Sequence, residues 1–156
     1  MSDTIDTKTW ASQQPDAVIL AATLLGEARG EDRQGREMIA SVVMTRVAFA
    51  QAHRARVDAP YWWGETPREV CLAHMQFDCW NPSDPNYAEI PALTGTPLWA
   101  EALEIATTAI SGALGDQANG STHYLNPQAV AQMPSWATAA NERAAHLHHV
   151  FYRVVP

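Results

Sequence analysis

A glutamate at the end of a long apolar segment is the residue of this sequence best suited to act as an acid. Glu27 follows nine almost entirely apolar residues, 17–25, and a second carboxylate, Glu31, stands four positions further on. A carboxyl group at the end of a buried helix is partly removed from water, which disfavours its charged form and raises its pKa. A general acid needs a raised pKa to stay protonated near neutral pH. The spacing therefore predicts that Glu27 can donate a proton to a reacting group.

The same carboxylates have a plainer interpretation. Glu27 and Glu31 could be charges at a helix end that pair with Arg29, Arg33 or Arg46. Because most charged side chains in proteins are solvated, the spacing alone is more typical of this structural role. Both interpretations stay open on these residues alone.

A second group of residues suits the binding of sugars. The segment 76–81 places Phe77 and Trp80 beside side chains that form hydrogen bonds, among them Gln76. Sugar rings stack their apolar faces on aromatic side chains while amides hold their hydroxyl groups, so this mixture predicts a glycan groove. Further tryptophans stand at Trp62, Trp63, Trp99 and Trp136. Any single tryptophan is nevertheless more typical of a core or loop-anchoring residue.

The histidines form a third group. Of the six in the chain, His146, His148 and His149 stand together near the C-terminus, and His123 precedes Tyr124. An H-x-H-H run can bind zinc, but the sequence has no H-E-x-x-H motif and no acidic residue within that run. We therefore expect structural or substrate contacts here, and neither a metal nor another cofactor. A nucleophilic serine is also disfavoured, because no G-x-S-x-G motif is present.

Charge and composition exclude several classes of partner. The chain has 156 residues, 10 basic against 17 acidic, and a formal net charge of −7. Nucleic acids and anionic membrane surfaces need clustered Lys and Arg, so we expect neither as a partner. No stretch approaches the ~20 apolar residues that cross a bilayer, which predicts no membrane insertion. Cys71 and Cys79 fit either a disulfide or two buried thiols.

The elements that must position these residues are mainly helical. Apolar periodicity, prolines and glycines predict helices from Asp16 to about Gly30, from Arg33 to Ala52, over Pro67–Ala73, and from Thr96 to Gly112 or Gly115. Gly30 is expected to cap the first of these in a left-handed conformation. The stretch 76–97, with four prolines, is predicted to be an irregular loop.

The end of the chain has a different character. Residues 122–125 and 149–155 are rich in aromatic and β-branched side chains and predict two strands that pair antiparallel. The fold class is therefore α+β, mainly helical, with a small antiparallel β element near the C-terminus. We expect one catalytic domain over residues 1–156, with residues 1–12 flexible.

Taken in order, the motifs resemble the SleB-type cell-wall hydrolase family, the spore-cortex-lytic enzymes. Residues 25–31, with Gly35 and then Thr45-Arg46-Val47, are similar to the opening of that family. Residues 76–80 resemble its Gln-Phe-Ser-Cys-Trp segment, and residues 116–124 its Asp…Gly-Ala-Thr-His-Tyr block. Residues 149–152 resemble its closing His-x-Phe-Tyr. The similarity runs from about Ala17 to Arg153.

This resemblance implies a lysozyme-like catalytic domain that cleaves peptidoglycan glycan strands between N-acetylmuramic acid and N-acetylglucosamine. It implies a lytic transglycosylase giving 1,6-anhydro products, with Glu27 as the catalytic acid. Glu31 matches a second acidic position whose role stays open. The residues expected to contact substrate are Glu31, Gln76, Phe77, Trp80, His123, Tyr124 and Tyr152. Thr45 stands where the family usually has Asn, Asp78 where it has Ser, and Ser121 where it has Ala. These departures affect the local hydrogen bonds and the polarity of the groove.

Several alternatives accompany this interpretation. The same bond could be hydrolysed by a muramidase, and a glycan-binding or virion protein could keep the fold without catalysis. A zinc amidase or peptidase is the least favoured. The N-terminus shows no secretory signal, which predicts synthesis in the cytoplasm and action on the wall in the periplasm or outside the cell. A phage or prophage endolysin released by a holin fits that expectation.

Overall fold

The computed structural model describes residues 5–156 and is mainly helical, with a small sheet near the C-terminus. The α-helices are α1 (Thr7–Ser12), α2 (Asp16–Ala28), α3 (Arg33–Val57), α4 (Pro67–Leu72) and α5 (Trp99–Ser111). Two 3-10 helices, η1 (Asp78–Trp80) and η2 (Tyr87–Gly95), and the strands β1 (His123–Leu125), β2 (Glu142–His146) and β3 (His149–Tyr152) complete it. The α+β class is confirmed. Among residues 5–156, none of the helices combines the length and apolarity that crossing a bilayer requires.

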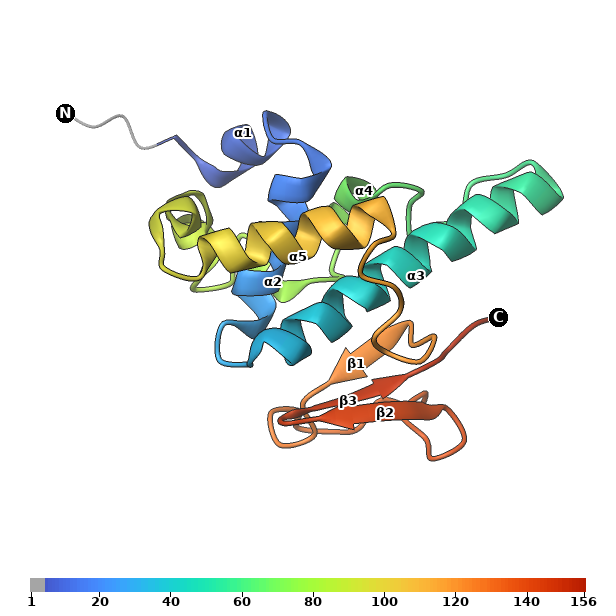
Figure 1. The fold of residues 1–156 in the computed structure, drawn as a ribbon. Coiled ribbons are helices and arrows are strands. Elements are labelled where there is room, and N and C mark those ends of the chain that lie inside the picture. The colour runs from blue at the N-terminus through green and yellow to red at the C-terminus, as the bar shows by residue number, and fades with distance from the viewer. Residues whose placement is uncertain (1–4) are drawn as a thin grey trace.

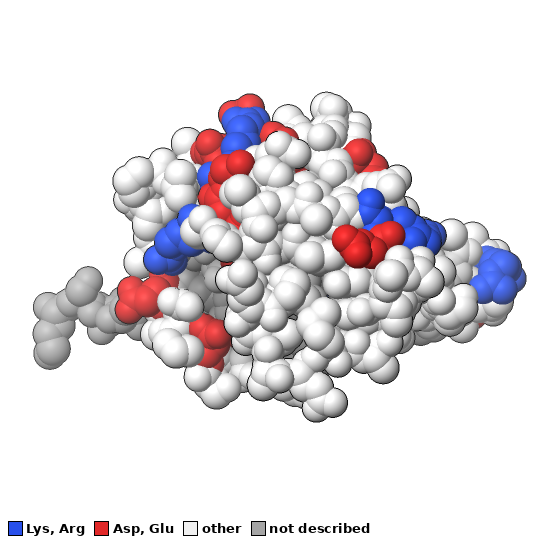
Figure 2. Space-filling model, turned by 90° about the horizontal axis from the view of Figure 1, so that it is seen from below, with Lys and Arg blue, Asp and Glu red and all other residues white. Residues whose placement is uncertain are grey.

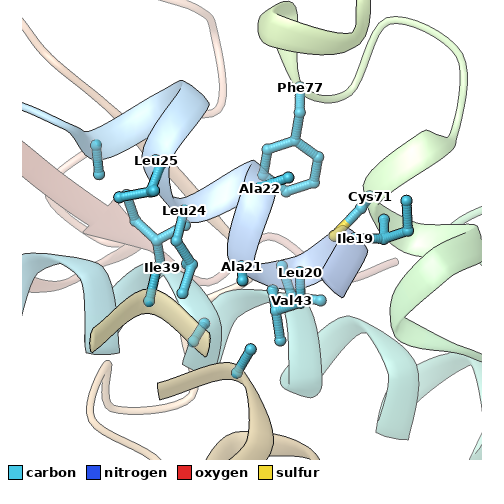
Figure 3. Close-up of a cluster of buried hydrophobic side chains, with 14 of the residues drawn as sticks. Ile19, Leu20, Ala21, Ala22, Leu24, Leu25, Ile39, Val43, Cys71 and Phe77 are labelled. Atoms are coloured by element: carbon cyan, nitrogen blue, oxygen red, sulfur yellow. The ribbon is translucent and has the colours of Figure 1, made fainter. Parts of the chain in front are cut away.

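Helix α2 forms the centre of the core. It packs against α3, α4 and α5, and its residues from Ile19 to Leu25 are buried. Figure 3 shows side chains of α2 lying between Ile39 and Val43 of α3 on one side and Phe77 on the other. Burial all around the helix agrees with its apolar sequence. The end of α2, where Glu27 stands, is therefore rigidly held.

Helix α3 is longer than expected and ends at Val57 instead of near Ala52. Its C-terminal end projects from the rest of the molecule (Figure 1). The following loop folds back along it: Arg54 Nε bonds Glu65 Oε2 at 2.6 Å, and the ring of Phe49 meets that of Tyr61 edge-on. These contacts stabilise turns that the apolar pattern alone does not predict.

The segment before α2 contains a short helix, although the sequence predicts a flexible N-terminus over residues 1–12. Residues 1–4 lie outside the described part of the chain, but Thr7–Ser12 form helix α1. The Asp6 carboxylate caps this helix by accepting from the Thr9 N–H at 3.0 Å. Trp10 is buried against the core, and Thr7 Oγ1 donates to the carbonyl of Tyr87. One aromatic anchor and one cap thus order a polar stretch.

The sheet has the strand order β1-β3-β2, with both pairings antiparallel. Pairing of β1 with β3 confirms the predicted ribbon, whereas β2 was not expected. Strand β2 joins β3 through a tight turn in which Leu147 has a φ of 48°. Figure 1 places the sheet beneath α3. Helix α5 lies across α2, on the side of α3 opposite the sheet.

Three predictions, one about a loop and two about helix ends, have different outcomes. The segment 76–97 is not wholly irregular, because it contains η1 and η2. The predicted left-handed cap at Gly30 is wrong: α2 ends at Ala28 with Arg29 still in the helical region, and Gly30 is not among the positive-φ glycines. Gly112, with a φ of 84°, does end α5 in the left-handed conformation.

The surface on the sheet side is sparsely charged. Figure 2 shows this face from below: most of it is uncharged, and its Lys and Arg side chains lie in separate places, mostly beside Asp or Glu. Phosphate recognition depends on clustered basic side chains, and this face offers no such cluster.

Candidate active site

A cleft of about 610 Å³ contains Glu27. It lies where the end of α2, helix α3, the loop before η1 and the sheet come together. Pockets of this volume accommodate small ligands and short stretches of a polymer. The lining residues are Glu27, Arg46, Trp62, Met75, Gln76, Phe77, Asp78, His123, Tyr124, Leu125, Asn126, Ala129, Val130, Trp136 and His149.

The backbone of η1 holds the Glu27 carboxylate. The main-chain N–H of Cys79 donates to Glu27 Oε1 at 3.0 Å. This approach depends on Gly26, because a Cβ there would lie 2.7 Å from both Cβ and Sγ of Cys79. The glycine thus lets η1 come close enough to α2 for its amide to reach the carboxylate.

Burial dominates the electrostatics of Glu27. Loss of solvent raises its pKa above the ordinary value of 4.5, and the negative charge of Asp78 adds to the rise. Hydrogen bonds from Cys79 and Tyr124 act in the opposite direction without cancelling it. Tyr124 Oη donates to Glu27 Oε2 at 3.3 Å, and burial raises the pKa of Tyr124 well above its usual range. The arrangement can hold a proton on an oriented carboxyl group.

Arg46 of α3 also lines the cleft. Its guanidinium is buried and donates to the carbonyl of Thr122 at 2.7 Å and to Gln76 Oε1 at 3.0 Å. It also stacks over the rings of Trp63 and Phe77, 5.2 and 5.8 Å from their centroids. Burial lowers the pKa of Arg46 to about 10, so it stays charged at neutral pH. It therefore fixes Gln76 and Thr122, the residue before β1, relative to α3.

Aromatic rings form another part of the cleft. His123 lies between Trp63 and Trp136, with ring centroids 5.9 and 4.8 Å away. Burial lowers the pKa of His123 to about 4, so the imidazole is neutral at neutral pH. Trp62 leaves 61% of its surface exposed at the cleft. Exposed indole and imidazole rings in a cleft can stack on sugar faces.

The structure brings together only part of the predicted substrate-contacting set. Gln76, Phe77, His123 and Tyr124 line the cleft with Glu27. The other three lie outside the lining: Trp80 donates from Nε1 to Thr23 Oγ1, Tyr152 packs edge-on against Trp136, and Glu31 contacts His148. For these three, contact with substrate stays a prediction.

Sequence reasoning did not place Arg46 or Asp78 among the expected substrate contacts, and for His149 it left a structural and a substrate contact open. A signal for Arg46 existed, because it stands in a helical stripe with Met38 and Val42, where an arginine breaks an otherwise apolar face. His149 was treated with its neighbours as one run, although alternate residues of a strand face opposite sides.

The arginine ion pairs of the described residues do not include the ones that a helix-end role of Glu27 and Glu31 predicts. Glu27 and Glu31 form no ion pair with an arginine among the described residues, whereas Arg33 bonds Glu37 and Glu104.

Cys71 and Cys79 are free, buried thiols, and burial raises the pKa of Cys71 to about 12. Within residues 5–156, three or more His, Cys, Asp or Glu side chains nowhere gather in a way that could hold a metal ion.

Comparison with known proteins gives a family for most of the chain. A family model described as Cell Wall Hydrolase matches residues 30–152. No curated protein matches the chain significantly, and neither does any solved structure. The matched region begins just after Glu27 and includes every other residue that lines the cleft.

Proposed function

Because the chain belongs to the cell wall hydrolase family, we propose that it is a SleB-like enzyme that cleaves the glycan strands of peptidoglycan. The bond cleaved joins N-acetylmuramic acid to N-acetylglucosamine, and the catalytic acid is Glu27. The reaction is that of a lytic transglycosylase, which leaves a 1,6-anhydro sugar.

The observation that carries the proposal is the convergence of separate sequence blocks on one carboxyl group. Residues 25–31 supply Glu27, and 45–47 supply the buried Arg46. The segments 76–80, 116–124 and 149–152 each add at least one further side chain to the same cleft. Glu27 is held there by a main-chain amide and a tyrosine hydroxyl, in surroundings dry enough to raise its pKa. Aromatic rings beside a protonated carboxyl group suit a sugar linkage.

In the first step Glu27 donates its proton to the oxygen of the glycosidic bond as that bond breaks. The N-acetylglucosamine leaves with a free hydroxyl group, and positive charge develops at C1 of the muramic acid. The acetamido group of the same sugar stabilises that charge, so no protein carboxylate has to attack. The Cys79 amide and the Tyr124 hydroxyl favour the carboxylate that Glu27 becomes.

In the second step the Glu27 carboxylate accepts the proton of the C6 hydroxyl group of the muramic acid. The C6 oxygen then bonds to C1 and closes the 1,6-anhydro ring. Glu27 returns to its protonated state, and no water is consumed. One residue thus serves first as acid and then as base.

Hydrolysis of the same bond is the second candidate, and Asp78 favours it. Its carboxylate is exposed and lines the cleft that contains Glu27. Inverting glycosidases place a second carboxylate on the opposite side of the scissile bond, where it activates the attacking water. Asp78 stands immediately before the residue whose amide holds Glu27.

Mass spectrometry of the soluble products from purified sacculi tests the proposal. A transglycosylase gives muramic ends that are lighter by one water than those of a hydrolase. We expect the anhydro product from wild type and from Asp78→Ser. Hydrated products from wild type, replaced by anhydro products in Asp78→Ser, would establish hydrolysis instead. Absence of soluble fragments despite binding to sacculi would indicate a non-catalytic glycan-binding protein.

A further inference from the structure

We propose that Glu31 is a positioning residue, which holds His149 against Tyr124 and so keeps the Tyr124 hydroxyl on Glu27. This role rests on the proposed function of Glu27. Glu31 does not line the cleft. It acts through a series of contacts that cross from the turn after α2 to β3, from β3 to β1, and from β1 back to the end of α2.

The Glu31 carboxylate is enclosed between the turn after α2 and the β2–β3 hairpin. Its side chain is 6% exposed, and Oε1 lies 2.9 Å from Nδ1 of His148 and 3.6 Å from Nδ1 of His149. Oε2 of Glu31 and Nδ1 of His149 are buried and have no hydrogen-bond partner. A buried polar atom without a hydrogen-bond partner is costly, and the Glu31 carboxylate is close enough to His149 Nδ1 to serve as its acceptor. A small rotation of the imidazole would bring Nδ1–H onto the carboxylate.

Gly35 makes room for this carboxylate. A Cβ at Gly35 would lie 3.0 Å from the Glu31 Cβ and 3.4 Å from its Oε2. Arg36 meanwhile donates to the main-chain carbonyl of Glu31 and bonds the Glu101 carboxylate at 2.6 Å. Charged and titratable groups facing Glu31 from the elements around it are therefore His148, His149 and Arg36, with Asp32 beside it in the chain.

From His149 the contacts continue to the reacting group. Its ring meets that of Tyr124 edge-on, with centroids 5.1 Å apart and an interplanar angle of 78°. Tyr124 then donates to Glu27 Oε2 at 3.3 Å, a long hydrogen bond that a small ring displacement would break. The ring of Tyr124 also contacts that of Phe151, whose centroid is 5.7 Å away. His149 is thus the part of this support that depends on a charged partner.

The neighbouring residue supplies a matched control. Asp32 also binds a histidine of the hairpin, with Oδ1 2.7 Å from Nε2 of His146. His146 neither lines the cleft nor forms a ring contact with Tyr124. Asp32→Asn therefore removes an acid–histidine pair of the same hairpin without touching the series that leads to Glu27. Asp32 also caps α3 through Gly35 N, a hydrogen bond that the Asn side chain can keep.

Carbon-detected NMR titration of the Glu27 carboxyl group tests the role apart from activity. In Glu31→Gln we expect the pKa of Glu27 to rise, because the Tyr124 hydrogen bond that lowers it is weakened. If Glu31 acted on Glu27 only through its charge, Glu31→Gln would instead lower the pKa of Glu27, because a nearby negative charge is removed. Asp32→Asn should leave it unchanged. A lowered or unchanged pKa in Glu31→Gln, or an equal rise in Asp32→Asn, would overturn the proposal.

A double variant and a rate measurement complete the test. The effect of Glu31→Gln should disappear in a Tyr124→Phe background, because both changes act on the same hydroxyl group. On sacculi, Glu31→Gln should lower kcat/KM roughly three- to tenfold, no more than removal of the Tyr124 hydroxyl group does, and Asp32→Asn less than twofold. Effects that add in the double variant would contradict the proposal. If Glu31→Gln does not fold, His149→Ala must give the same pKa rise. Activity retained in Glu27→Gln would refute the proposed function and leave the NMR result standing.

Discussion

The main-chain N–H of Cys79 reaches Glu27 at 3.0 Å because Gly26, the residue before the glutamate, has no side chain. A Cβ at position 26 would lie 2.7 Å from two atoms of Cys79, closer than packed atoms approach. A helix interior normally disfavours glycine by about 1 kcal/mol relative to alanine. This glycine is therefore retained for the approach of η1 to α2, on which the orientation of the carboxyl group depends.

We predict that Gly26→Ala inactivates the enzyme although alanine favours a helix. The new methyl group must displace η1, and the Cys79 amide then no longer bonds Glu27. Activity on sacculi should fall by about 100-fold or more, the scale on which misplacement of a catalytic group acts. Gly30→Ala is the control, because a Cβ there meets nothing within 4 Å. Equal activities of the two variants would disagree with this account of Gly26.

Tyr124→Phe should move the alkaline limb of the pH–rate profile to higher pH. The lost hydroxyl favours the charged carboxylate, so its removal raises the pKa of Glu27 further. A general acid must be protonated, and activity is lost as pH rises through that pKa. The maximal rate should fall by about tenfold or less, because one hydrogen bond contributes about 1 kcal/mol. A limb that moves to lower pH would contradict the assignment.

Glu27→Gln should make the folded state more stable at neutral pH. The folded pKa of Glu27 is raised above 4.5, so the folded protein holds this proton more tightly than the unfolded chain. The tighter proton binding stabilises the folded state below pH 4.5, and this contribution to the free energy of unfolding is lost as pH rises through the folded pKa. Glutamine does not titrate, so the Tm of Glu27→Gln minus that of wild type should grow between pH 4 and pH 8. A constant or shrinking difference would show that burial does not raise this pKa.

Arg46→Ala should destabilise the fold by about 2–3 kcal/mol in urea unfolding. The change leaves the carbonyl of Thr122 and Oε1 of Gln76 without their donor, and a buried unpaired acceptor costs about 1–3 kcal/mol. Arg33→Ala is the control, because its pairs with Glu37 and Glu104 are exposed and should contribute less than about 1 kcal/mol. A loss no larger than that of Arg33→Ala would mean that Arg46 does not hold the cleft together.

The parts of the fold that the sequence predicts are those with strong local patterns. The uniform apolarity of α2 and the aromatic and β-branched residues of β1 and β3 each indicate their element without help from the rest of the chain. Strand β2 has no such pattern: Glu142–His146 becomes a strand by pairing with the edge of β3. Helix α1 likewise depends on the burial of Trp10 against residues far along the chain. Neither tertiary contact can be deduced from local composition.

The same distinction applies to the cleft. Glu27, Gln76, Phe77, His123 and Tyr124 are predictable because they stand in compact, chemically mixed motifs. Arg46, Trp136 and His149 reach the cleft from a long helix, a loop and a strand, and only the three-dimensional packing brings them there. Glu31 shows the converse, because its position in the motif suggests a substrate contact while the fold directs it to two histidines.

The release of soluble muropeptides by Glu27→Gln tests the central claim most directly. Purified sacculi are digested with equal amounts of wild type and variant at the pH optimum, and the fragments are quantified by chromatography. The variant should keep the folded structure and binding to sacculi but release fragments at least about 100 times more slowly, because it has no proton to give. Release by a folded Glu27→Gln at more than a tenth of the wild-type rate would contradict the role of Glu27 as the catalytic acid.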